Sequence, residues 1–201
     1  IPGMSADILN LDGQKVSTNE MGELVMRKSS IGLTKSLWND DKRYIDNYWS
    51  VIKDYWVHGD LASRDADGHW YLHGRSDDTI KVSGKRIGPS ELESVIVKSG
   101  KVKEVAAVGI PDENKGSKII LSIVPAENND QKESFFEDLV IKDLGKSFKP
   151  DKVIFVKDLP KTRNMKIMRR VIKSCLTNED LGDISTLLNP ESVEEIKEHA
   201  V

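Results

Sequence analysis

The sequence predicts an α+β protein in two parts, a β-rich module over residues 1–77 and a mixed-sheet α/β module over residues 78–201. In the first part, short aromatic-rich apolar runs are separated by turn signals such as Leu11-Asp12-Gly13. In the second part, apolar runs alternate with segments of helical period, which is typical of strands covered by helices. Because the pattern changes at residues 76–78, we place a domain boundary there.

Strands are predicted wherever apolar residues cluster between turn signals in either module. In the first module the runs are Ala6 to Leu9, Glu23 to Met26, Tyr55 to His58 and Trp70 to His73. In the second module they are Val102 to Ile110, Lys118 to Val124 and Val153 to Val156.

The first predicted helix of the second module covers residues 90–99. Ser90 and Glu93 have the S-x-x-E spacing of a capping box, and Gly100 can supply the left-handed residue that ends a helix.

Further helices follow from the same signals. Asp130 and Glu133 are expected to cap a helix that Gly145 stops, and Asn189 followed by Pro190 starts a final short helix. A stripe at helical spacing predicts one more helix between them, and consists of Ile167, Met168, Val171, Ile172 and Cys175.

Composition narrows the class of protein. With 38% hydrophobic and 31% charged residues, the 201-residue chain is expected to be globular. A formal net charge of −3, from 30 basic and 33 acidic residues, provides no basic field for nucleic acid. The run from Ile119 to Ala126 is far short of the roughly 20 apolar residues that cross a bilayer, and Ile1-Pro2-Gly3 shows no signal-peptide pattern. We expect a cytoplasmic protein without a membrane or nucleic-acid partner.

Cysteine and histidine usage argues against a protein-only metal site. The single cysteine, Cys175, lies on an apolar helical stripe and is expected to be a buried thiol. The histidines His58, His69, His73 and His199 have no HExxH or related spacing.

Several motifs, read together, resemble the last third of the AMP-forming acyl-CoA synthetases, in the superfamily that includes luciferases and peptide-synthetase adenylation domains. They are Trp56-Val57-His58-Gly59-Asp60, Gly74-Arg75-Ser76-Asp77, Gly84-Lys85-Arg86-Ile87, and Pro160-Lys161-Thr162 with Lys166. The segments Trp38 to Trp49 and Leu181 to Pro190 further resemble the acetyl- and propionyl-CoA synthetase branch.

This resemblance implies a fold and a reaction. Residues 1–77 would be the end of a β-barrel subdomain of the large domain, and residues 78–201 the mobile cap domain with helices packed on a small mixed sheet. In the complete enzyme, a small carboxylic acid reacts with ATP and Mg²⁺ to give acyl-AMP, and coenzyme A then displaces AMP. The missing N-terminal domain would be the partner.

Asp60 and Arg75 are the predicted nucleotide-binding pair. A carboxylate after a glycine at a strand end can accept hydrogen bonds from two vicinal hydroxyls, as a ribose presents. By resemblance, Asp60 holds the ribose and Arg75 joins it. A surface aspartate and a structural ion pair are the alternatives.

The resemblance also implies roles for Asp77, Gly84 and Arg86. Asp77 would be the hinge, since a short polar connector residue can absorb a backbone rotation. Gly84 fits a hairpin turn at positive φ and, by resemblance, lines the pantetheine tunnel, although it could serve only the turn. Arg86 would lie near phosphate.

Lys166 is the predicted catalytic residue. An ammonium that touches both the carboxylate and the α-phosphate lowers their repulsion and stabilises the charge developed in transfer. Met165 replaces the usual glycine, and would cost about 1 kcal/mol if its φ is positive. For the CoA 3′-phosphate, Ile141 stands where a basic residue is usual, which leaves Lys142 as a substitute. A solvated surface lysine is the alternative for Lys166.

The phosphate loop of the family has no counterpart among these 201 residues, since Ser29 to Lys35 contains too few glycines. The chain alone is therefore expected to be an inactive fragment of the enzyme. The alternative is a non-catalytic module that binds a nucleotide or a partner domain. An adenylation domain that loads a carrier protein is disfavoured by the residues 181–190.

Overall fold

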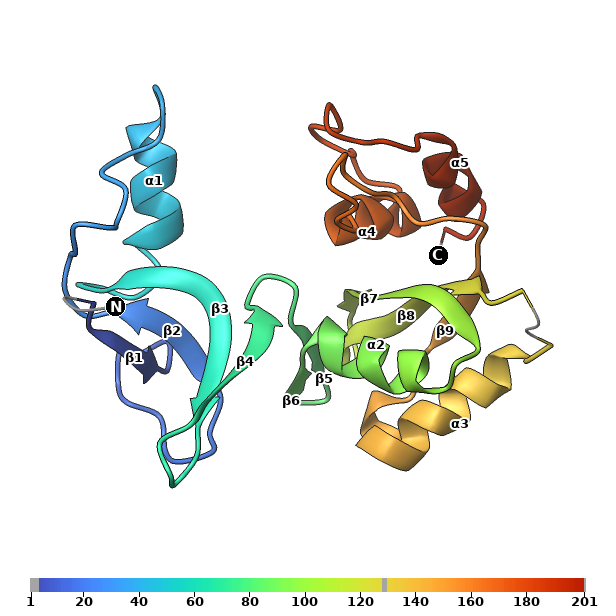
Figure 1. Ribbon diagram of the computed structural model, residues 1–201, viewed down its shortest axis with the longest axis horizontal. Coiled ribbons are helices and arrows are strands. Elements are labelled where there is room, and N and C mark those ends of the chain that lie inside the picture. The colour runs from blue at the N-terminus through green and yellow to red at the C-terminus, as the bar shows by residue number, and fades with distance from the viewer. Residues whose placement is uncertain (1–3, 128–129, 201) are drawn as a thin grey trace. The chain divides into compact units, whose positions relative to one another are not determined.

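The computed structural model describes residues 4–127 and 130–200 (Figure 1). The chain divides into two compact units, Ile1–Asp77 and Asp78–Val201. Strands and helices are combined in both units, and this confirms the predicted mixed α/β class.

The described part of the first unit contains a four-stranded antiparallel sheet in the order β1-β2-β3-β4. The strands are β1 (Ala6–Leu9), β2 (Gly22–Met26), β3 (Trp56–Arg64) and β4 (Trp70–Arg75). All the predicted runs lie in these strands except Tyr55, which precedes β3. The strands β3 and β4 extend beyond the predicted runs, to Arg64 and Arg75, because polar, charged and apolar residues all continue the ladder there.

A helix that the sequence analysis did not predict, α1 (Asp41–Tyr48), lies between β2 and β3. The Asp40 side chain accepts a hydrogen bond from the backbone N–H of Arg43 and so caps its N-terminus. The ring of Tyr48 stacks on Trp56 of β3, with centroids 5.3 Å apart and planes 5° from parallel. Since only Tyr44 of α1 is buried, the helix lacks the apolar stripe on which such predictions depend.

The second unit is built around β7 (Val102–Asp112), β8 (Gly116–Pro125) and β9 (Lys152–Phe155). Strands β7 and β8 pair antiparallel, and β9 joins β8 in parallel. A separate hairpin, β5 (Ile80–Val82) and β6 (Lys85–Ile87), precedes them.

Helices cover both faces of this sheet (Figure 1). Even-numbered residues of β7, such as Ala106 and Val108, pack against α4 (Arg169–Thr177) and α5 (Glu191–Lys197). Odd-numbered residues, such as Val105 and Ala107, pack with α2 (Pro89–Lys98) and α3 (Glu133–Leu144). The strand period of two therefore sorts apolar side chains into two cores. The predicted packing of helices on this sheet is confirmed.

The predicted N-terminal caps of α2 and α3 are wrong. Helix α2 is capped by Gly88, whose N–H donates to Glu91 Oε1 at 3.2 Å. Pro89 fixes the first helical φ and so starts the helix before Ser90. Helix α3 starts after Lys132 without a side-chain cap, so Asp130 lies outside it.

Other boundary predictions have mixed outcomes. Gly100 takes φ 68° after α2 and Gly145 follows α3, as expected. Ile167 and Met168 precede α4 instead of lying on it, because the chain there forms a turn. Cys175 is buried, as predicted, and burial raises the pKa of its thiol.

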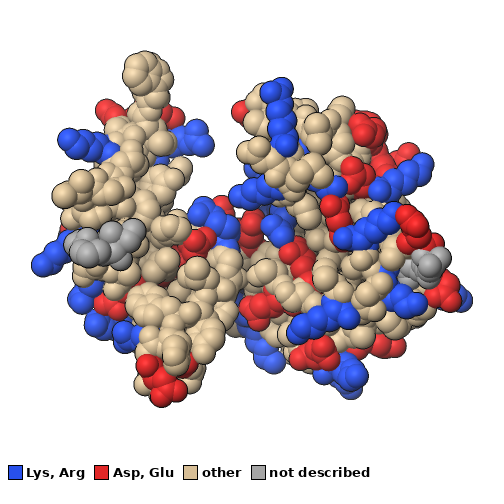
Figure 2. Space-filling view, in the orientation of Figure 1, with Lys and Arg blue, Asp and Glu red and all other residues tan. Residues whose placement is uncertain are grey.

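The surface carries both signs of charge. Figure 2 shows Lys and Arg side chains beside Asp and Glu over the visible face of each unit. Among the described residues, no helix is long and apolar enough to span a membrane.

Candidate functional site

Asp60, Arg75 and Asp77, predicted from separate motifs, lie together in the first unit. Asp60 and Arg75 are directly paired across β3 and β4. The Arg75 Nη1 atom is 3.7 Å from Asp60 Oδ1, and Nε is 3.2 Å from Asp77 Oδ1. The guanidinium therefore lies between two carboxylates, and Nη1 also donates to the His58 carbonyl at 3.3 Å.

A backbone bulge in β3 creates this arrangement. The pairing with β2 is interrupted between Leu61↔Glu23 and Val57↔Val25. Gly59, in the bulge, takes φ 82°, and a Cβ there would lie 2.9 Å from Arg75 Nη2. The positive φ favours glycine at this position, and the absence of a Cβ lets the guanidinium pack closely over the backbone.

His58 is a neighbour that the sequence analysis did not assign. Its Nδ1 atom is 2.7 Å from Asp60 Oδ2, and its ring contacts Trp56 edge-on. Residues two apart in a regular strand face the same side, so the spacing of His58 and Asp60 could have indicated that their side chains are neighbours. The bulge interrupts this regular alternation, so the spacing alone does not establish the contact.

A cavity of about 310 Å³ opens beside these residues within the first unit. It is lined by the end of α1 and by residues of the bulge and of the β4 end, including Tyr48, His58, Gly59, Arg75 and Asp77. Arg75 and Asp77 line this open cavity, where an arginine can bind an anion and an aspartate can accept a hydrogen bond from a hydroxyl group.

The predicted hairpin turn at Gly84 is confirmed. Ser83 and Gly84 connect β5 to β6 with φ of 49° and 80°, which is the two-residue turn with two left-handed residues. A Cβ on Gly84 would meet nothing within 4 Å, so the glycine presents open backbone. Arg86, on β6, is exposed.

Lys142 lies exposed in the last turn of α3. The hairpin is tied to the segment after α3, since Lys85 Nζ donates to Ser147 Oγ at 3.0 Å. Nothing in the structure assigns Lys142 or Arg86 a ligand, and their roles stay predictions.

Lys166 is exposed on a tight turn between Lys161 and Ile167, which are bridged antiparallel. The Thr162 N–H donates to the Lys166 carbonyl at 2.9 Å, and the Lys166 N–H donates to Thr162 Oγ1 at 3.2 Å. Met165 takes φ 62° and is 58% exposed. The positive φ expected of a glycine position is therefore present, with methionine in it.

Relief of this strain is testable in the 201-residue chain. Met165→Gly is expected to stabilise the chain by about 1 kcal/mol and to raise its Tm by about 2–4 °C. Arg163→Gly, in the same turn but outside the positive φ range, should lower Tm instead. A lower Tm for Met165→Gly would show that the methionine side chain contributes more than its backbone angle costs.

An ion pair that sequence reasoning missed follows the Lys166 turn. Arg169 donates from Nε to Glu93 Oε1 at 2.9 Å and from Nη2 to Oε2 at 2.6 Å. Burial, the largest influence, lowers the pKa of Arg169, but the bonds and charge of Glu93 outweigh it and leave that pKa raised. Glu93 also accepts from the Ala107 N–H at 2.9 Å, so the predicted capping residue instead joins α2 to β7 and α4.

Asp65, Asp67 and His69 offer donor atoms within 4.8 Å of one another in the β3–β4 loop. Both oxygens of Asp65 already accept hydrogen bonds, from the His69 N–H at 2.9 Å and from the Tyr71 hydroxyl at 2.9 Å. These bonds account for the cluster as a loop-stabilising arrangement.

Comparison with known proteins shows which enzymes the chain resembles. Residues 91–166 match the AMP-binding enzyme C-terminal domain. The acetyl-coenzyme A synthetase of Methanothrix thermoacetophila is 41% identical over 98% of this chain, which covers 31% of that protein. The acetyl-coenzyme A synthetase of Pasteurella multocida is 37% identical over 98% of this chain, which covers 32% of it.

A solved structure shows the same fold. The acetoacetyl-CoA synthetase from Streptomyces lividans superposes with a TM-score of 0.85 at 23% identity, over 97% of this chain and 30% of that one. The chain thus spans about three tenths of the length of each of these proteins.

Residues 91–166 are therefore similar to the AMP-binding enzyme C-terminal domain. The predicted resemblance to the C-terminal part of the AMP-forming acyl-CoA synthetases is confirmed, and the two relatives compared by sequence are acetyl-CoA synthetases.

Proposed function

We propose that this chain is the C-terminal part of an AMP-forming short-chain acyl-CoA synthetase. The complete enzyme joins a small carboxylate to the α-phosphate of ATP, with Mg²⁺, and releases pyrophosphate. Coenzyme A then attacks the acyl-AMP, so that a thioester forms and AMP leaves. Such an enzyme would work in the cytoplasm, where ATP and coenzyme A are available.

The observation that carries this proposal is the Lys166 turn. The backbone of Lys166 is hydrogen-bonded across the turn to Thr162 through both its carbonyl and its N–H, while the lysine side chain is exposed. A cation held on a fixed backbone and open to solvent suits transient contact with two anions. In this proposal Lys166 bridges the carboxylate and the α-phosphate during adenylation.

The other site residues bind and move the substrates. Asp60 would accept hydrogen bonds from the ribose hydroxyls, and Arg75 would hold the nucleotide beside it. Arg86 would approach phosphate, while Gly84 and Lys142 would contact coenzyme A through its pantetheine and its 3′-phosphate. Asp77 would be the hinge about which residues 78–201 rotate between the two steps.

Each compact unit has a place in the proposal. The sheet β1–β4 would be the end of a β-barrel subdomain of the large domain, and the second unit would be the mobile domain. Similarity to acetyl-coenzyme A synthetases over 98% of the chain supports acetate or propionate as the acid.

The isolated chain provides a test of this assignment. Residues 1–201 alone should not exchange pyrophosphate into ATP in the presence of acetate or propionate, because their sequence contains no glycine-rich phosphate loop. Exchange is measured with labelled pyrophosphate and purified chain. Exchange above background would contradict the proposal that these residues are one part of the catalytic machinery.

A further inference from the structure

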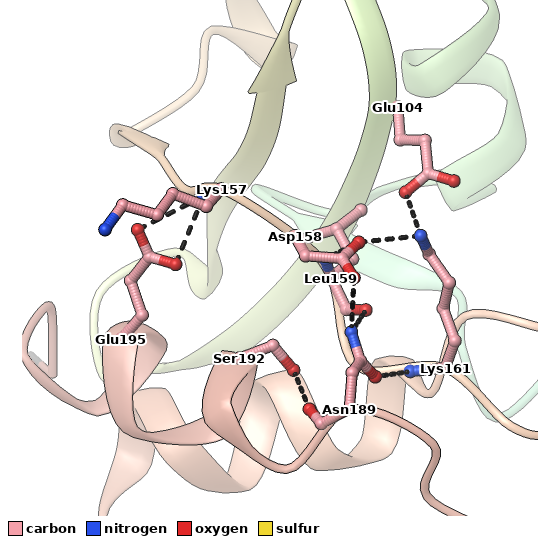
Figure 3. Close-up of polar contacts among 8 residues, drawn as sticks. All are labelled: Glu104, Lys157, Asp158, Leu159, Lys161, Asn189, Ser192 and Glu195. Atoms are coloured by element: carbon pink, nitrogen blue, oxygen red, sulfur yellow. Dashed lines mark hydrogen bonds and ion pairs between the residues drawn. The ribbon is translucent and has the colours of Figure 1, made fainter.

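We propose that the strap formed by residues 186–189 positions the Lys166 turn for adenylation, with Lys161 and Asn189 as the positioning residues. This inference rests on the proposed function of Lys166. The strap comes from the segment after α4, and Figure 3 shows Asn189 beside Lys161 and Asp158.

Backbone hydrogen bonds join the strap to the first strand of the turn. The Leu188 N–H donates to the Lys161 carbonyl at 2.8 Å, and the Arg163 N–H donates to the Thr186 carbonyl at 3.2 Å. Thr162 and Leu187 form an antiparallel bridge between these two bonds. The strap therefore pairs with residues 161–163 like an added strand.

The Asn189 side chain locks the end of this pairing. Its Oδ1 atom accepts from the Lys161 N–H at 3.0 Å, while Nδ2 donates to Asp158 Oδ2 at 2.6 Å and to the Leu159 carbonyl at 2.8 Å. Asn189 is only 6% exposed. A buried amide with both ends hydrogen-bonded fixes orientation, because any shift leaves a buried polar group unpaired.

The Lys161 side chain also holds residues 161–163 in place, through contacts with β7 and with Asp158. Its ammonium lies 2.7 Å from Glu104 Oε2 of β7 and 2.7 Å from Asp158 Oδ1, and the side chain is 7% exposed (Figure 3). Burial, the largest influence, lowers the pKa of Lys161, but Asp158 and Glu104 outweigh it and leave that pKa raised. This lysine is thus charged and enclosed, so its role is to hold the strand.

Two hydrogen bonds connect the anchored segment, residues 161–163, to Lys166. Thr162, next to Lys161, donates its N–H to the Lys166 carbonyl and accepts the Lys166 N–H at Oγ1. On the far side, Arg169 is held by Glu93. Loss of the strap would release one side of the turn only, and a displacement of about 1 Å at a catalytic group costs on the order of 10²-fold in rate.

The test separates positioning from general stability in the proposed complete enzyme. Asn189→Ala should lower adenylation, measured by carboxylate-dependent pyrophosphate exchange, by about 10- to 100-fold. Thioester formation from supplied acyl-adenylate should stay within about twofold. Equal loss of both half-reactions would overturn the inference.

A matched control comes from the same tail. Glu195 accepts the Lys157 N–H at 3.1 Å through both carboxylate oxygens, so Glu195→Ala removes a tail contact that does not reach the turn (Figure 3). It should leave adenylation within about threefold. If Asn189→Ala does not fold, Asn189→Ser, which retains a hydroxyl, serves in the same comparison.

A double-mutant cycle links the strap to Lys166. If Asn189 acts through Lys166, then Asn189→Ala should lower adenylation no further in a Lys166→Ala background. A further loss of the full 10-fold or more would show an independent effect and would contradict the inference.

Hydrogen exchange in the 201-residue chain tests positioning without any activity. In Asn189→Ala the Thr162 and Lys166 amides should exchange at least about 10-fold faster, while the amides of β8 stay unchanged. Unchanged exchange at Thr162 and Lys166 would overturn the inference. If exchange rises but Lys166→Ala has no effect on adenylation, the strap positions the turn and the proposed function of Lys166 fails.

Discussion

Lys166→Ala in the complete enzyme should depress carboxylate adenylation by about 10³-fold or more, since the substitution removes a cation that stabilises charge during transfer at phosphorus. Thioester formation from supplied acyl-adenylate should survive within about twofold, because the turn would have moved away with the second unit. Both half-reactions are measured on the same preparation, by pyrophosphate exchange and by thioester release.

The Lys166 side chain is exposed, so its truncation should leave folding unchanged. Arg163→Ala is the matched control, because Arg163 is an exposed cation on the same turn. It should leave both steps within about threefold. If Lys166→Ala also leaves both steps within about twofold, Lys166 is a surface lysine, and if it damages both alike, its role is structural.

Asp77→Pro should impair thioester formation and spare adenylation, which is the reverse of the result expected for Lys166→Ala. Proline fixes φ near −65° and restricts the residue before it, so the connector would hold a single orientation. Adenylation should be retained, whereas thioester formation should fall by about 10²-fold or more because the rotation is blocked. Asp77 is the last residue of the first unit and its side chain is 70% exposed, so the change removes no packing.

Asp77→Ala controls for the loss of the carboxylate. It removes the contact with Arg75 at 3.2 Å but leaves the backbone free to rotate. Both half-reactions should therefore persist in Asp77→Ala. Equal loss of both steps in Asp77→Pro, or loss of thioester formation in Asp77→Ala, would argue against a hinge.

Local patterns predicted the second unit well. Buried residues form continuous runs along β7 and β8 and alternate between the two cores, so the strands and the helices packed on them could be inferred from the apolar runs. The predicted cap of α2 was wrong because a spacing rule does not include partners that are distant in sequence. Glu93 fits a capping box in sequence, but an arginine 76 residues away binds it in the fold.

The candidate site likewise combines local features that the sequence indicates with contacts between residues that are distant in sequence. The positive φ at Met165 follows from the local turn and could be anticipated from a glycine position. The enclosure of Lys161 depends on Asn189 and Glu104, which are 28 and 57 residues distant in sequence, and nothing in the local pattern distinguishes it from an exposed lysine. Likewise, the close approach of the Arg75 guanidinium to Gly59 joins two strands and lies at the bulge in β3.

The most direct test of the proposed function is acetate-dependent exchange of pyrophosphate into ATP by the complete enzyme, with and without residues 78–201. We expect exchange in the complete enzyme, and a loss of about 10³-fold or more on deletion, because the deletion removes the Lys166 turn. Exchange that persists without these residues, or an enzyme that exchanges with neither acetate nor propionate, would contradict the account.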